Sequence, residues 1–161
     1  MPLLLRRIGA GIGVVLLQWL VFGRLGLWGV VPDVVLLFVA LVAIKRGRLA
    51  GAVAGFSAGL VMDILTNPTM FGLNALVKTL MGFVVGLFRS DQGENTRINP
   101  PQALVGALVV GVVQNGLMTI LLALDQNTRT PFLIAGLWLG GAVYTAVVAF
   151  VAALFSAPRG R

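Results

Sequence analysis

The stretch GAVAGFSAGLVMDIL, residues 51–65, decides the fold. Gly51, Gly55, Gly59 and Asp63 lie four residues apart in it, so on a helix all four share one face. The three glycines, here called the glycine strip, leave a smooth surface that lets a second helix approach closely. Such small-residue strips are typical of transmembrane helices, where a carboxylate is costly and usually has a purpose. The stretch therefore predicts a membrane helix with one close neighbour.

The composition supports a lipid environment for the whole chain. Of its 161 residues, 58% are hydrophobic and 11% are charged, and the mean hydropathy is +1.00. Soluble domains average about 45–50% apolar and about 25% charged residues. The excess of apolar residues cannot be buried in one soluble core of this size. We therefore expect one polytopic membrane domain over residues 1–161.

Charge and residue types exclude several functions. The net charge of +7 comes from basic residues that lie between apolar segments, so membrane topology explains it and nucleic-acid binding is not expected. The chain has no cysteine and no histidine, and it has no phosphate loop, G-x-S-x-G or H-E-x-x-H motif. With five acidic residues, few acid–base sites can be built. We predict no enzyme activity, no metal and no cofactor.

The apolar runs predict an all-α integral membrane protein with six transmembrane helices and both termini in the cytoplasm. The predicted spans are residues 8–22, 30–44, 49–65, 70–88, 103–124 and 131–155, with a cytoplasmic loop over 89–101. The second span is short, because fifteen residues reach only about 22 Å of a bilayer core about 30 Å thick. A crossing is still favoured, because it places most Lys and Arg residues in the cytoplasm.

The two acidic residues within the apolar segments allow more than one interpretation. Asp33 follows Pro32 in the first turn of the second helix, where it either complements the helix dipole or binds a partner. Asp63 lies near the outer end of the third helix. It is either solvated there or paired with Lys78, whose ammonium can extend toward the same level. Lys78 could instead reach headgroups or water alone.

The fourth predicted helix carries a matching face. Asn74, Lys78, Gly82 and Gly86 are four residues apart and therefore share one face of this helix. The face is polar in its first half and consists of small residues in its second half. We expect the third and fourth helices to form a hairpin packed along these two faces.

A polar cluster is expected within the membrane. Its members are Asn74, Lys78, Gln114 and Asn115, and Gln18, Thr119 and Tyr144 are also polar residues within the membrane. These side chains either line an outward-facing pocket or act as interhelical hydrogen bonds, and hydrogen bonding between helices is the favoured interpretation. Trp28 and Trp138 are expected to be anchors at the lipid headgroups or partner contacts.

The ordered set of motifs from residue 30 to residue 86 resembles the MreD family of bacterial rod shape-determining proteins. The similar features are a P-D helix start, a basic turn, G-x-x-x-G-L-x-x-D, a short turn and F-G-x-x-A-L. The residues that match are Pro32, Asp33, Gly55, Gly59, Asp63, Gly72 and Leu76.

The resemblance implies a non-catalytic scaffold in the bacterial cytoplasmic membrane. It implies direct binding of MreC through apolar and small-residue helix faces. At the level of the complex it also implies association with MreB, RodA and a penicillin-binding transpeptidase in lateral wall synthesis. A second copy of this chain is a further candidate partner.

The same hairpin is also similar to the substrate-capturing subunits of energy-coupling-factor (ECF) vitamin transporters. Those subunits are small six-helix proteins with ligand pockets that open outward. The chain has 8% aromatic residues and one tyrosine, which counts against a vitamin site. The scaffold is therefore the main expectation, and the transporter subunit is the alternative.

Overall fold

The computed structural model describes residues 2–24, 26, 29–66, 71–89, 98–124 and 133–156, and every regular element in them is helical. The expectation of an all-α membrane protein with six helices is confirmed. Three helical segments are long and apolar enough to cross a membrane, Arg48–Thr66, Pro100–Leu122 and Gly136–Phe155. The six α-helices are α1 (Pro2–Leu20), α2 (Val34–Arg46), α3 (Arg48–Thr66), α4 (Leu73–Leu87), α5 (Pro100–Leu122) and α6 (Gly141–Ser156). A short 3-10 helix, η1 (Phe22–Arg24), follows α1, and a π-helix, η5 (Leu133–Gly140), runs into α6.

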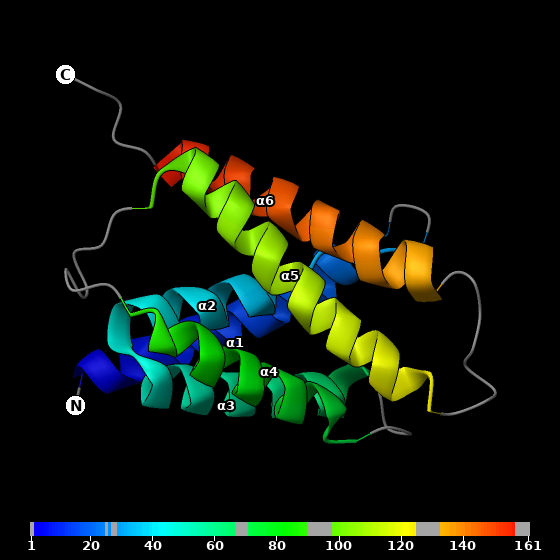
Figure 1. Ribbon diagram of the computed structural model, residues 1–161. Helices are drawn as coiled ribbons and strands as arrows, with labels where there is room; N and C mark the ends of the chain where they lie inside the picture. Colours follow the sequence, from blue (N-terminus) through cyan, green and yellow to red (C-terminus); the bar gives the residue numbers. More distant parts are fainter. Residues whose placement is uncertain are drawn as a thin grey trace.

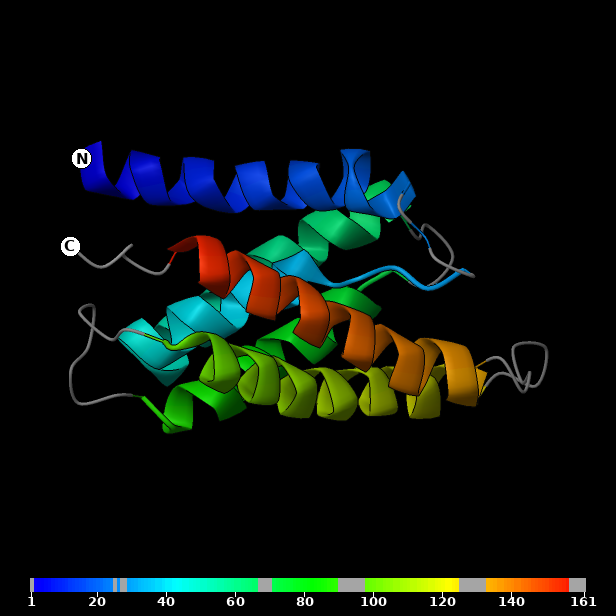
Figure 2. The same cartoon turned by 90° about the horizontal axis from the view of Figure 1, so that it is seen from above.

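The helices form two groups. Helices α1 to α4 pack together, and α5 and α6 lie beside one another across α2 and α4 (Figure 1). In the view from above, α1 lies at one edge of the bundle (Figure 2). Contacts between the two groups are fewer than contacts within each group. The space between the groups is therefore where a cavity can form.

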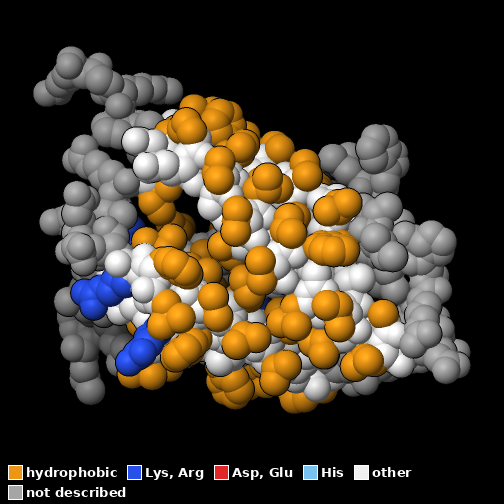
Figure 3. All heavy atoms as spheres, in the orientation of Figure 1, with side chains coloured by type: hydrophobic (Ala, Val, Ile, Leu, Met, Phe, Trp, Pro, Cys, Tyr) orange, Lys and Arg blue, Asp and Glu red, His pale blue; other side chains and the backbone are white. Residues whose placement is uncertain are grey.

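The two ends of the bundle differ in charge. The start of α1, the α2–α3 turn, the end of α4 and the end of α6 all lie at one end (Figure 1). Basic side chains lie at this end, and the rest of the visible surface is largely apolar (Figure 3). By the positive-inside rule this end is cytoplasmic, and the opposite end is here called the outer end. The basic residues of the turn and of the end of α4 are Lys45, Arg46, Arg48 and Arg89.

Helix α2 begins at Val34, not at residue 30 as expected. Pro32 disfavours helical geometry in the residue before it, and the Asp33 side chain accepts a hydrogen bond from Leu36 N at 2.8 Å as an N-cap. The thirteen residues of α2 are about 20 Å long, too short for the hydrocarbon core. The chain just before α2 therefore runs inside the bundle as non-helical backbone.

Other helix boundaries differ from the sequence expectation by a few residues. Helix α1 already begins at Pro2. Helix α5 begins at Pro100, because prolines suit a first helical turn and Gln102 Oε1 accepts from Asn99 N at 3.2 Å. In the described part of the last span, the first element is the π-helix η5. The predictions for Trp28, for the first two residues of the 131–155 span and for most of the 89–101 loop fall outside the described residues.

Helices α3 and α4 approach closely along their glycines. A Cβ atom at Gly55 would collide with backbone atoms of Lys78 and Thr79, and one at Gly59 would lie 2.6 Å from Ala75 Cα. Gly51 faces Gly82 in the same way. The three turns of α3 that carry these glycines therefore contact α4 backbone to backbone, which only glycine allows.

Asp63 caps the start of α4 from the neighbouring helix. Its carboxylate is fully buried and accepts from Gly72 N, Asn74 N and Ala75 N at 3.0–3.1 Å, and from Asn74 Nδ2 at 3.0 Å. These donors include backbone N–H groups of the first turn, which would otherwise lack partners. The suggested Asp63–Lys78 pair is wrong. The Asp63 carboxylate accepts hydrogen bonds from backbone N–H groups at the start of α4, and the Lys78 ammonium pairs with a different carboxylate.

Candidate functional site

Lys78 pairs with Asp33, not with Asp63. Its ammonium donates to Asp33 Oδ2, and the same oxygen accepts from Gln114 Nε2 at 2.7 Å. The Lys78 side chain is 2% exposed and the Asp33 side chain 22% exposed. One carboxylate thus joins α2, α4 and α5, and its remaining exposed surface lies on a cavity wall.

The backbone before α2 is held by side chains from α1 and α6. Gln18 Nε2 donates to Pro32 O at 2.8 Å, and Gln18 Oε1 accepts from Val34 N at 2.8 Å. Asp33 N donates to Thr145 Oγ1 at 2.9 Å. Non-helical backbone is tolerated at membrane depth only where protein buries it or where it lines a cavity. Gln18 and Thr145 satisfy these backbone groups by hydrogen bonding and so hold the start of α2 in place. We call Gln18, Asp33, Lys78, Gln114 and Thr145 the Asp33 cluster.

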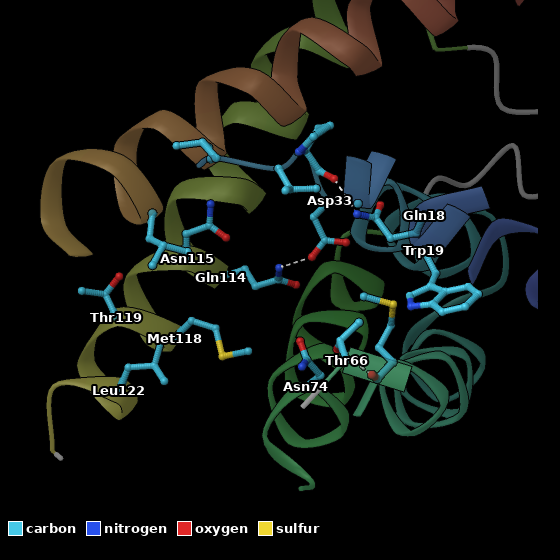
Figure 4. Close-up of a pocket in the computed structure, with 17 residues that line it drawn as sticks. Gln18, Trp19, Asp33, Thr66, Asn74, Gln114, Asn115, Met118, Thr119 and Leu122 are labelled. Carbon is cyan, nitrogen blue, oxygen red and sulfur yellow. Dashed lines mark hydrogen bonds between the residues drawn. The ribbon is translucent and has the colours of Figure 1, made fainter. Parts of the chain in front are cut away.

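A cavity of about 350 Å³ lies beside the Asp33 cluster, toward the outer end. Figure 4 shows Gln114 reaching from α5 to Asp33, with Asn115 beside it on the same helix and with Asn74 and Thr66 on the side of α4 and α3. The volume falls in the range of about 300–1,000 Å³ that small-molecule sites occupy. The polar side chains of the wall are Gln18, Asp33, Thr66, Asn74, Gln114, Asn115 and Thr119, and the larger apolar ones are Trp19, Val30, Val31, Pro32, Met62, Met118, Leu122 and Leu137.

Two buried polar atoms of this wall have no hydrogen-bond partner among the described residues. They are Gln114 Oε1 and Thr119 Oγ1, and their side chains are 3% and 9% exposed. Buried polar atoms are nearly always paired, so each of these two oxygens calls for a hydrogen-bond donor, from water or from a bound ligand. Both belong to α5, about 7.5 Å apart along its axis.

The π-helix η5 shapes the α6 side of the cavity. The Trp138 indole donates to Val112 O at 2.9 Å, and Asn115 Nδ2 donates to Trp138 O at 3.4 Å. Gly116 gives the indole room, because a Cβ there would lie 3.0 Å from its nitrogen. Trp138 is therefore tied to α5 by a hydrogen bond. Wide helical turns of this kind are frequent at functional sites.

The structure places the predicted residues around the cavity, between packed helices or on the outside of the bundle. Asn74, Gln114 and Asn115 line the cavity, and Lys78 supports it from below through Asp33. Gly72 is the N-cap of α4 with a φ of 95°, and Leu76 is 60% exposed on the outside of the bundle. Pro32 and Asp33 form the start of α2 and also line the cavity, and the residues of helix packing are Gly51, Gly55, Gly59, Asp63, Gly82 and Gly86.

Sequence reasoning missed Thr145 and the central place of Asp33. Thr145 directly follows Tyr144 in an otherwise apolar run, and nothing in the sequence singled it out. The central place of Asp33 could have been inferred from the sequence. A proline and an aspartate before a helix too short to span the membrane imply that the helix start, and its carboxylate, lie deep in the bundle.

A comparison of the chain with known protein families found a matching family. The chain matches, over residues 29–157, the model of the family described as "ECF-type riboflavin transporter, S component". No curated protein and no solved structure matches the chain. The match covers the hairpin motifs and also α5 and α6, which carry much of the cavity wall.

This finding overturns the expectation of a rod-shape scaffold. The match supports the alternative, so the MreD assignment and the partners MreC, MreB, RodA and a transpeptidase are wrong for this chain. Among the motifs that suggested them, Gly55 and Gly59 pack α3 against α4 and Asp63 caps α4, structural roles that do not identify a function. The apolar helices and the family place the protein in the bacterial inner membrane as a multi-pass protein. The chain belongs to the family of ECF-type riboflavin transporter S components.

Proposed function

We propose that this protein is the substrate-capturing subunit of an ECF-type transporter and that its outer cavity binds riboflavin. The observation that carries the proposal is the pair of buried, unpaired polar atoms on α5, Gln114 Oε1 and Thr119 Oγ1, in a cavity of about 350 Å³. A polar guest would supply the missing hydrogen bonds. The substrate is taken from the family description.

The electrostatics of the cavity suit a neutral ligand. Asp33 is the one ionisable side chain among the described residues of its wall, and Lys78 offsets the charge of that carboxylate from behind. A charged ligand would have to lose its hydration without gaining an opposite charge. Riboflavin, a neutral molecule with a flat ring and a hydroxylated chain, fits a wall of amides, hydroxyls and apolar side chains.

The mechanism requires partners that supply energy. The described residues contain no nucleotide-binding motif and no metal-ligand cluster, so this subunit would capture the substrate rather than drive its transport. We propose that it assembles with ATP-binding-cassette subunits and a coupling membrane protein, as its family implies. It would act as a binding subunit and not as an enzyme.

Riboflavin binding by the purified protein tests this proposal. In mild detergent we expect saturable quenching of flavin fluorescence with one ligand per chain. Met118→Trp fills the cavity and should weaken binding at least about tenfold, equal to about 1.4 kcal/mol. The matched control is Val113→Trp, on the 52% exposed, lipid-facing side of the same helix, and it should bind normally. Absence of saturable binding, or equal losses in both variants, would contradict the proposal.

A further inference from the structure

The orientation of the Gln114 amide is fixed by its neighbours. Gln114 Nε2 donates to Asp33 Oδ2, which also accepts from the Lys78 ammonium. An ionised carboxylate only accepts hydrogen bonds, so the amide must turn its NH₂ group toward Asp33. The carbonyl oxygen Oε1 then faces away from Asp33 and has no partner among the described residues.

We propose that Gln114 selects the ligand by accepting a hydrogen bond from a ring N–H, and that Asp33 and Lys78 are positioning residues that fix its amide for this task. The inference rests on the proposed function and deepens it, because it names the recognised group. Gln114 is 3% exposed, so an unfilled acceptor there is costly and a ligand lacking the donor is rejected.

The chemistry of riboflavin identifies the donor. Its flat ring has a single N–H, which lies between two carbonyl groups, and its other donors are the hydroxyls of the flexible chain. Gln114 lies beside the start of α2, whereas Thr66 and Asn74 lie at the outer ends of α3 and α4. The hydroxyl groups of the chain find more hydrogen-bond partners at the outer side, where these polar side chains and water are available. The ring edge with its N–H therefore points inward, to Gln114.

A ligand that lacks only this donor tests the inference. The probe is riboflavin methylated at the ring N–H, compared with riboflavin itself on the full-length protein in mild detergent. We expect the methylated ligand to bind the unmodified protein about 10- to 100-fold more weakly, because it leaves the buried acceptor unpaired. Equal affinity for the two ligands would overturn the inference.

Substitution of Gln114 must abolish this discrimination. In Gln114→Met the acceptor is lost at nearly constant size, so riboflavin should bind more weakly and the two ligands should differ by less than about twofold. Gln102→Met, the same change at the exposed start of α5, is the matched control and should keep the full ratio. Gln114→Asn is the substitute if the methionine variant does not accumulate in membranes. It keeps an amide on a shorter side chain that withdraws the oxygen from the ligand, so the ratio of the affinities for riboflavin and the methylated ligand must also fall.

The role of the charge pair has a separate readout. Asp33→Asn with Lys78→Met removes both charges together, so the Gln114 amide is free to turn. We expect the ratio between the two ligands to fall about fivefold or more, an effect that a purely structural role would not produce. An unchanged ratio would overturn the positioning role. Riboflavin binding without discrimination would refute this inference alone, whereas absence of riboflavin binding would refute the proposed function as well.

Discussion

We expect Gly55→Ala to destabilise the protein severely, although it adds a single methyl group. That methyl would collide with the backbone of Lys78 and Thr79 on α4, and neither can move without separating the two helices. Overpacking commonly costs about 1–3 kcal/mol, and a clash between backbones belongs at the upper end or above. The measurement is the free energy of unfolding in mixed micelles, followed by circular dichroism during titration with sodium dodecyl sulfate.

The control for this variant is the same substitution in open space. Gly106 lies within α5, and no neighbouring atom lies within 4 Å of the position that an added methyl group would take. Gly106→Ala should therefore be neutral or should stabilise the helix by up to about 1 kcal/mol. If Gly55→Ala unfolded at the same detergent fraction as Gly106→Ala, the close approach of α3 and α4 would be refuted.

Asp33→Asn should cost about 3–5 kcal/mol, because it leaves the Lys78 ammonium without an opposite charge. Asparagine is as good an N-cap as aspartate, so the start of α2 keeps its capping group and the charge is what changes. We expect low accumulation in membranes and early unfolding in the same detergent titration.

A second substitution separates charge from packing. Lys78→Met added to Asp33→Asn removes the unpaired ammonium, and most of the lost stability should return. A double variant that is less stable than Asp33→Asn alone would contradict this account of the pair. So would an Asp33→Asn protein as stable as the unmodified one.

Local features of the sequence predicted the helical class and the membrane location. Periodic apolar runs and a low charge content report directly on the surroundings of each segment. The spacing of Gly51, Gly55 and Gly59 predicted a close helix neighbour, and the structure places α4 against all three. Such patterns are readable because they depend on one helix and its face.

The pairing of Lys78 was not predictable in the same way. It depends on which helices flank α4, and the sequence shows only that Asp63 lies close along the chain. In the structure Asp63 is occupied by the first turn of α4, and α2 brings Asp33 to the lysine from 45 residues away. Contacts between distant segments require the arrangement of all six helices.

The function was misassigned because the motifs between residues 30 and 86 include only part of the cavity wall. The matched pattern ends at residue 86, whereas α5 carries the unpaired Gln114 and Thr119 oxygens. The low aromatic content was also a poor criterion, since amides, hydroxyls and methionines form much of the cavity wall. Overall composition does not show which side chains meet at one site.

Affinity purification of this protein from its native membranes in mild detergent tests the central claim most directly. A substrate-capturing subunit should bring down ATP-binding-cassette subunits and a coupling membrane protein in stoichiometric amounts. Recovery of wall-synthesis proteins such as MreC and RodA without any ATP-binding-cassette subunit would contradict the account.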